Sequence, residues 1–99
     1  MMNVYLFAVG AIDPIKHRKD AKQAVEFIKT LPGFVAIHPN LDYSLLCFDT
    51  LDNAIISRGK WTETGNDAAR YIMEATIEKG KGLLTVKGPA WDSQGGQVQ

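Results

Sequence analysis

The chain has 99 residues, with eleven lysines and arginines against eleven aspartates and glutamates, so its formal net charge is zero at pH 7. A chain of this length is expected to form one domain. Its shares of hydrophobic residues (45%) and charged residues (22%) are typical of folded rather than disordered proteins. The balanced charge argues against a histone-like protein or a general polyanion binder, because such proteins need many basic contacts to phosphate.

Cysteine content and the apolar N-terminal run indicate the compartment. The single cysteine, Cys47, excludes an internal disulfide and a cysteine-rich zinc module. The apolar run from Val4 to Val9 is too short to span a bilayer, and it lacks the basic start and the cleavage site of a secretion signal. We therefore expect a cytoplasmic protein.

The first half of the chain predicts a strand, a helix and a hairpin. Residues 3–10 are rich in β-branched and aromatic side chains and end at a glycine, as strands do. Asp13-Pro14 has the composition of a helix start, and apolar residues then recur at helical spacing until Pro32-Gly33. Phe34–His38 and Tyr43–Phe48 are strand-like and flank a turn, so they predict a hairpin.

The second half predicts a helix and one or two strands. Asp49 or Thr50 can cap a helix over Leu51–Thr64. Arg70–Glu78 alternates in the way of a half-buried strand, and Leu83–Val86 predicts a short fifth strand or a covering segment.

The order of these elements predicts a ferredoxin-like α+β domain over residues 1–90, with the βαββαβ connectivity. Its four strands would form an antiparallel sheet in the spatial order 4-1-3-2, with both helices on one face and a possible short fifth strand. Residues 91–99 are polar and glycine-rich, and they predict a flexible C-terminal tail.

Alternation assigns the strand residues to two faces of this sheet. Toward the helices we expect Val4, Leu6, Ala8, Val35, Ile37, Leu46, Phe48, Tyr71, Met73 and Ala75. On the opposite, open face we expect Tyr5, Phe7, Val9, Phe34, Ala36, His38, Tyr43, Leu45 and Cys47. Because a contiguous apolar patch is seldom left in water, something should cover the open face. Three covers are possible: the chain's own Leu83–Val86 with Trp91, a second copy of the chain, or a different partner.

Part of the open face resembles an RNA-recognition motif. Val4-Tyr5-Leu6 is similar to the start of that family's first-strand motif, and Tyr43–Phe48 to the end of its third-strand motif. The resemblance implies that Tyr5 and Tyr43 stack on RNA bases and that Phe48 lies in the core. Leu45 stands where the family has a second third-strand aromatic.

The first predicted helix is basic at its start. Residues 16–29 carry five lysines and arginines against two acidic residues. Lys16, Arg18 and Lys19 fall in the first turns, where positive charge opposes the helix dipole. This unfavourable placement predicts contact with an acidic partner or with phosphates.

Residues suited to catalysis are few. His17 and His38 lie on different predicted elements, and neither has a carboxylate or cysteine at metal-ligand spacing. His38 and Glu74 could act as an acid–base pair, but their strands lie at opposite edges of the predicted sheet. We therefore predict no enzyme, no cofactor and no metal site. A small dimeric enzyme with its cleft on the sheet face remains an alternative.

The sequence thus favours a non-catalytic protein that binds another protein, or a second copy of itself, through the open sheet face. The residues predicted to make contact are Tyr5, Phe7, Tyr43, Leu45, His38, Lys16, Arg18 and Lys19. In size and style the chain resembles the inhibitors, anti-CRISPR proteins included, that phages and mobile elements use against bacterial nucleases. RNA binding is the alternative that the strand motifs imply.

Overall fold

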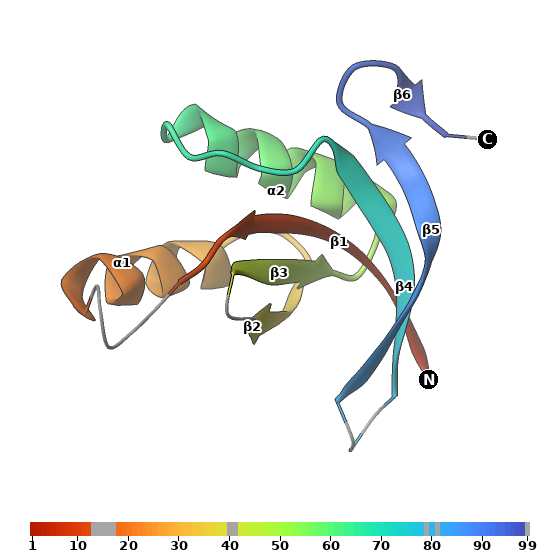
Figure 1. The fold of residues 1–99 in the computed structure, drawn as a ribbon, viewed down its shortest axis with the longest axis horizontal. Helices are drawn as coiled ribbons and strands as arrows, with labels where there is room; N and C mark the ends of the chain where they lie inside the picture. Colours follow the sequence, from red (N-terminus) through yellow and green to blue (C-terminus); the bar gives the residue numbers. More distant parts are fainter. Residues whose placement is uncertain (13–17, 40–41, 79, 81, 99) are drawn as a thin grey trace.

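Two helices and a six-stranded antiparallel sheet make up the fold. The computed structural model describes residues 1–12, 18–39, 42–78, 80 and 82–98. The elements are, in chain order, β1 (Met2–Gly10), α1 (Arg18–Lys29), β2 (Phe34–Pro39), β3 (Tyr43–Phe48), α2 (Leu51–Glu63), β4 (Tyr71–Glu78), β5 (Leu83–Asp92) and β6 (Gly96–Gln97). The strands lie in the order β2-β3-β1-β4-β5-β6 (Figure 1). The predicted α+β class is confirmed.

The last part of the sheet is larger than predicted. The sequence predicts a short fifth strand that ends at Val86, and Gly88 and Pro89, which follow it, are residues that weaken or interrupt strands. The structure carries the strand on to Asp92 with two register shifts, at Glu74/Ala75 and at Ile72/Met73 of β4. Each shift leaves one extra residue on β5, Lys87 and Ala90, so the strand carries a bulge on either side of the paired Gly88 and Pro89 instead of ending there.

The C-terminal segment is a short strand where a flexible tail was expected. β6 pairs with the end of β5 through Trp91 and Asp92, and the backbone N–H of Val98 donates to the carbonyl of Ala90 at 3.0 Å. Trp91 packs against the core, and this contact offsets the entropy of ordering a polar segment.

Local signals place the two helices. Thr50 is the N-cap of α2, and its Oγ1 accepts the backbone N–H of Asn53 at 3.1 Å. Buried Ser57 donates from Oγ to the carbonyl of Pro32 at 3.1 Å, which ties α2 to the end of the α1 turn. Gly33, between α1 and β2, has a φ of +72°, a conformation that glycine adopts without strain.

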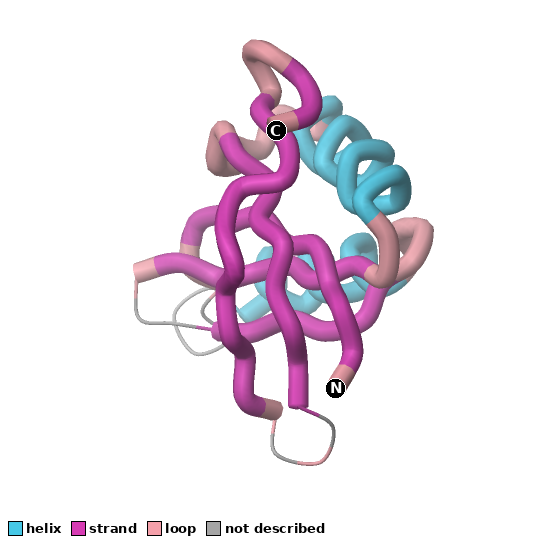
Figure 2. The backbone as a smooth tube through the Cα atoms, turned by 90° about the vertical axis from the view of Figure 1, so that its right-hand side faces the viewer, coloured by secondary structure: helices cyan, strands magenta, loops and turns pink. Residues whose placement is uncertain are grey.

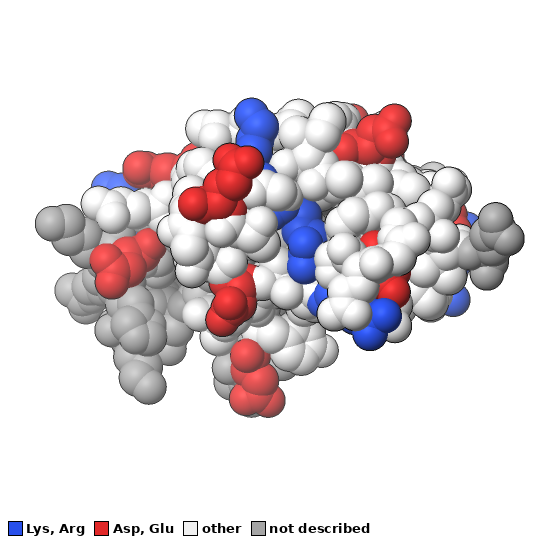
Figure 3. Space-filling view, turned by 90° about the horizontal axis from the view of Figure 1, so that it is seen from above, with Lys and Arg blue, Asp and Glu red and all other residues white. Residues whose placement is uncertain are grey.

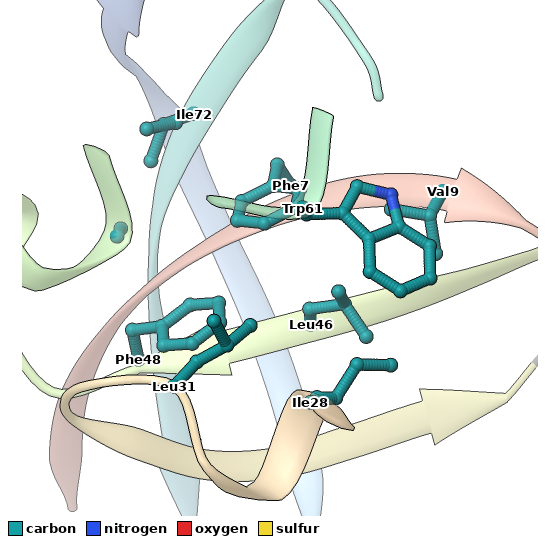
Figure 4. Close-up of a cluster of buried hydrophobic side chains, with 9 residues drawn as sticks. Phe7, Val9, Ile28, Leu31, Leu46, Phe48, Trp61 and Ile72 are labelled. Atoms are coloured by element: carbon teal, nitrogen blue, oxygen red, sulfur yellow. The ribbon is translucent and has the colours of Figure 1, made fainter. Parts of the chain in front are cut away.

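Both helices pack on one face of the sheet, over a core shown in Figure 4. Phe7 and Phe48 stack there with their ring centroids 5.5 Å apart. The buried members of this core are Phe7, Val9, Ile28, Leu31, Leu46, Phe48, Ala54, Trp61 and Ile72. In the described residues neither helix is long and apolar enough to cross a membrane.

The predicted face assignment is wrong for β1 and β4. Phe7 and Val9 lie in the helix-side core, and Ile72 joins them from β4. Leu6 and Ala75 instead lie on the face away from the helices. The run 4–9 is apolar at every position, so alternation gave no phase for β1. The large phenylalanine rings fill the space between sheet and helices, and the smaller residues take the other side.

β2 divides its residues differently from the prediction because it is irregular. The register with β3 shifts between Phe34 and Ala36. Phe34 therefore packs with Ile37 on the helix-side core, and Val35 packs on the opposite side. For β3 the predicted faces are confirmed: Leu46 and Phe48 lie in the helix-side core.

Candidate functional site

Most of the face of the sheet away from the helices is uncharged, and this uncharged part is called the second face below. Cross-strand pairing and alternation also place Tyr71 and Asp92 on this side, at the far end of β4 and β5, but Asp92 is paired with Arg70 there and the two are not counted in the second face. Cross-strand pairing, alternation and side-chain packing assign sixteen other described residues to it, and none of these is Asp, Glu, Lys or Arg. His38 and Tyr43 are its polar members. The sixteen are Met2, Val4, Leu6, Ala8, Val35, Ala36, His38, Tyr43, Leu45, Cys47, Met73, Ala75, Ile77, Leu84, Val86 and Pro89.

The floor of the second face is already buried within one chain. Val4, Cys47 and Ala75 have no exposed surface, and Leu6 is 2% exposed. β4 and β5 cross β2 and β3 at a steep angle (Figures 1 and 2), so the sheet bends strongly. Half-buried neighbours such as Leu45 pack around these four residues and shield them. The remaining members form a partly exposed apolar rim.

The polar residues of β1, β4 and β5 lie on the side of the sheet opposite to the second face. Asn3 pairs with Thr76, and Thr76 with Thr85, on the side of the sheet that carries the helices. This end of β4 and β5 lies away from both helices (Figure 1). The polar side is thus the solvated one, and an antiparallel sheet usually covers its apolar side. Among the described residues no second layer lies over the second face.

Three of the predicted contact residues lie on the second face. His38 pairs with Leu45, which pairs with Ala8, so these three form one row across the sheet. Tyr43 begins β3 at the end of the same face and is 41% exposed. Leu45 packs against the buried floor.

Two predicted contact residues lie on the other side. Phe7 is fully buried against the helices, so it cannot be a surface anchor. Tyr5 is half-buried and packs against the same helix-side core, opposite Phe48 and Glu74. The continuous platform expected from Tyr5 and Tyr43 is therefore not formed, because β1 has the opposite phase.

The basic residues of the first helix are placed only in part. Lys16 lies outside the described residues. Arg18 and Lys19 are the first two residues of α1, and the structure describes only their backbone. Their role as partner contacts stays a prediction.

Sequence reasoning missed the members of the second face that come from β4 and β5. Met73, Ile77, Leu84 and Val86 lie around Ala75 there. The alternation of Ile72, Glu74, Thr76 and Glu78 with these apolar positions contained the signal. Glu74, Thr76 and Glu78 lie on the helix-bearing side of β4, which extends beyond the helices into water, where acidic and hydroxyl side chains are well solvated.

An ion pair and a ring contact hold the end of β5. Arg70 donates from Nε and Nη2 to the two carboxylate oxygens of Asp92, each at 2.8 Å. These hydrogen bonds, with that from the backbone N–H of Gln94, hold the pKa of Asp92 below its ordinary value. The Arg58 guanidinium lies over the Trp91 ring, 5.6 Å from its centroid. This cluster fastens the β5–β6 end to α2.

A groove of about 610 Å³ lies between α1 and the edge strand β2. Val25 and Ile37 supply apolar lining, and Lys22, Glu26 and Lys29 lie along it. Buried Ser44, also in the lining, already accepts the backbone N–H of residue 12 at 3.3 Å. The groove therefore offers no unsatisfied buried polar group to select a ligand.

Chemically reactive groups are not gathered in the described part of the chain. It holds no group of three His, Cys, Asp or Glu side chains that could bind a metal ion. Burial raises the pKa of the Cys47 thiol to about 12, so the nucleophilic thiolate is scarce at neutral pH. Seen from the side that carries α2, acidic and basic residues are interspersed (Figure 3).

The second face is thus the surface whose composition most needs an explanation. It combines a buried floor, an apolar rim and no charge, and it joins three of the sequence-predicted contact residues. Comparison of the chain with protein-family models, with curated proteins and with solved structures finds no match.

Proposed function

We propose that this protein acts by binding another protein through the second face, without catalysing a reaction. The observation that carries the proposal is the uncharged, apolar composition of that face over sixteen described residues. Apolar surface gains free energy when a partner removes it from water. The preferred partner surface is itself apolar and uncharged, because burying an unpaired charge against the second face would be costly.

The size of the exposed rim fits a small interface. A strand spacing of about 4.8 Å and a two-residue rise of about 6.7 Å give each residue roughly 32 Å² of sheet surface. Twelve of the sixteen members lie outside the buried floor, so the rim has a footprint of about 400 Å² on this scale. Its solvent-exposed area is smaller, because eight of the twelve side chains are half-buried. The largest apolar patch of a typical monomer is about 300–600 Å² and is often functional.

A protein partner suits this face better than RNA. The second face has no lysine or arginine, whereas RNA binding relies on contacts to phosphate. Tyr5, one of the two stacking positions implied by the RNA-recognition resemblance, packs toward the helices. RNA binding would therefore need a different surface, such as the start of α1.

The proposal includes a ferredoxin-like core. Within the sheet, β4, β1, β3 and β2 are neighbours in the spatial order 4-1-3-2, and both helices pack on one face. β5 and β6 then extend the sheet beyond β4. In that arrangement the face opposite the helices is free to bind a partner.

The test is affinity capture from cells that naturally carry the protein, with two matched variants. Tyr43→Lys places a charge on the second face at a residue that is 41% exposed, and Ile56→Lys does so on α2 at one that is 49% exposed. A protein captured by the parent chain and by Ile56→Lys, but lost with Tyr43→Lys, supports the proposal. Circular dichroism of both variants checks that they fold.

Two results would contradict the proposal. Equal capture by both variants would mean that the second face is not the contact surface. Captured material that ribonuclease removes would make RNA the partner. The narrower expectation of an inhibitor of a bacterial nuclease stays a prediction, since the second face has no charge pattern that selects a nuclease over another protein.

A further inference from the structure

Most of β5 forms an unpaired edge of the sheet. β6 pairs only with Trp91 and Asp92, and β4 lies on the inner side of β5. Among the described residues, no strand pairs with the outer side of Leu83–Lys87. Such an edge presents a row of backbone N–H and C=O groups that can pair with another strand.

The exposed edge is also unusually apolar. Its sequence is Leu-Leu-Thr-Val-Lys, in which Leu83 is 59% and Val86 is 48% exposed. Natural edge strands are commonly protected by charge, proline or a bulge. Here these devices begin only at Lys87, where the bulge and then Pro89 follow. The four residues Leu83–Val86 precede these devices and favour pairing with another strand.

We propose that two copies of this chain pair through these edges, β5 against β5, antiparallel and centred on Thr85. A two-fold axis through Thr85 makes the contact self-complementary, which is the commonest symmetry of soluble dimers. Leu84 then lies opposite Val86 of the second copy. Leu83 lies opposite Lys87 of the second copy, whose aliphatic stem can cover the leucine.

Neighbouring registers are less favourable. Centring the pair on Lys87 places two like charges directly opposite each other, which destabilises a cross-strand pair. Centring it on Val86 brings Pro89 into the ladder opposite Leu83, and proline has no N–H to donate. Centring it on Leu84 shortens the paired run. The register on Thr85 pairs Leu84–Val86 in full, brings Leu83 opposite Lys87 and avoids both problems.

The dimer joins the two second faces. Directly opposite residues of an antiparallel pair point to the same side of the sheet. Leu84 and Val86 both belong to the second face, so their pairing makes one uncharged surface across both copies. Dimerisation itself does not depend on the proposed partner, and it would present that partner with twice the apolar area.

Disulfide trapping tests the register. In Thr85→Cys the two introduced thiols lie directly opposite, with Cβ atoms about 4.5–5.5 Å apart, close to disulfide geometry. Cys47 is fully buried and its pKa is raised to about 12, so it should not compete. We expect a covalent dimer under mild oxidation, at concentrations where the parent chain is dimeric by sedimentation.

Two offset variants are the matched controls. Leu83→Cys alone should not cross-link, because four residues of register separate the two thiols by about 14 Å. An equimolar mixture of Leu83→Cys and Lys87→Cys should cross-link between unlike chains. Cross-linking by Leu83→Cys alone, at the level of Thr85→Cys, would overturn the proposed register.

Charge substitution tests whether the edge holds the dimer. Thr85→Lys and Thr85→Glu each place like charges at the two-fold axis, and each should weaken dimerisation about fivefold or more. Mixing these two variants should restore a dimer of unlike chains, and Thr85→Val should leave the parent affinity unchanged. Restoration by mixing requires folded chains, so it separates the edge contact from misfolding.

Two results would overturn the proposal. One is a parent chain that sediments as a monomer at millimolar concentration. The other is a dimer that resists both Thr85 charge variants but dissociates with Tyr43→Lys, because that dimer would be held by the second face. Loss of captured partner with Tyr43→Lys while the dimer persists would instead concern only the proposed function.

Discussion

Phe7→Ala tests the observed phase of β1 directly. The side chain has no exposed surface, and its ring stacks on Phe48 at 5.5 Å between centroids. Replacing a buried phenylalanine with alanine leaves a cavity and costs about 3–5 kcal/mol. A domain of this size has a total stability of about 5–15 kcal/mol. At about 4–8 °C per kcal/mol, the melting temperature should fall by at least about 12 °C.

Thermal and urea unfolding, followed by circular dichroism, measure this loss. The matched control is Tyr43→Ala, which truncates an aromatic residue that is 41% exposed on the second face. The control should change the free energy of unfolding by no more than about 0.5 kcal/mol. A Phe7→Ala chain that melts within about 4 °C of the parent would refute the placement of Phe7 in the helix-side core.

Four further substitutions test features outside that core. The hydrogen bonds from Arg70 lower the folded-state pKa of Asp92, so their stabilisation is present at neutral pH and is lost as pH falls from about 3.9 through the lowered value. Asp92→Asn should therefore lower the melting temperature at pH 7 but not in strong acid; an equal effect at both would count against the pair. Ser57→Ala leaves the carbonyl that it binds unsatisfied and should cost about 1–3 kcal/mol in urea unfolding, unlike a neutral surface change. Gly33→Ala places a methyl group against two side chains at a positive φ and should destabilise by more than about 1 kcal/mol. In Gly59→Ala the added methyl group of α2 has no atom within 4 Å, so this substitution should raise the free energy of unfolding by about 1 kcal/mol. If Gly33→Ala and Gly59→Ala both stabilised or both destabilised the protein, the result would contradict the local geometry.

Elements with a strong local signal were predicted well from the sequence. The strand Tyr43–Phe48 has the predicted bounds, and α2 begins at the predicted Leu51 after the threonine cap. These features depend on neighbouring residues. The length of β5 could not be predicted in this way, because pairing with β4 absorbs Lys87 and Ala90 as bulges at positions where local composition favours a turn.

The candidate site was only half predictable because its faces depend on long-range pairing. In β3 only Ser44 interrupts the apolar and aromatic run Tyr43–Phe48, and the phase expected for Leu45 and Cys47 is the one observed. β1 is apolar on both sides, and its phase is set by strands that are distant in the chain. Phe7 was therefore misplaced, and the part of the second face on β4 and β5 was missed.

The central position of β1 has a consequence for how the chain reaches its native state. Tyr5 pairs with Phe48, and Val4 pairs with Ala75. The strands that pair with β1 therefore lie about 40 and 70 residues further along the chain. Closing such long loops costs entropy before any pairing repays it, which slows folding. Until β4 is available, an apolar strand with one open edge can pair with other unfinished chains. Fragments that end before Tyr71 should therefore aggregate, and the risk during synthesis lies in the delay before β4 emerges.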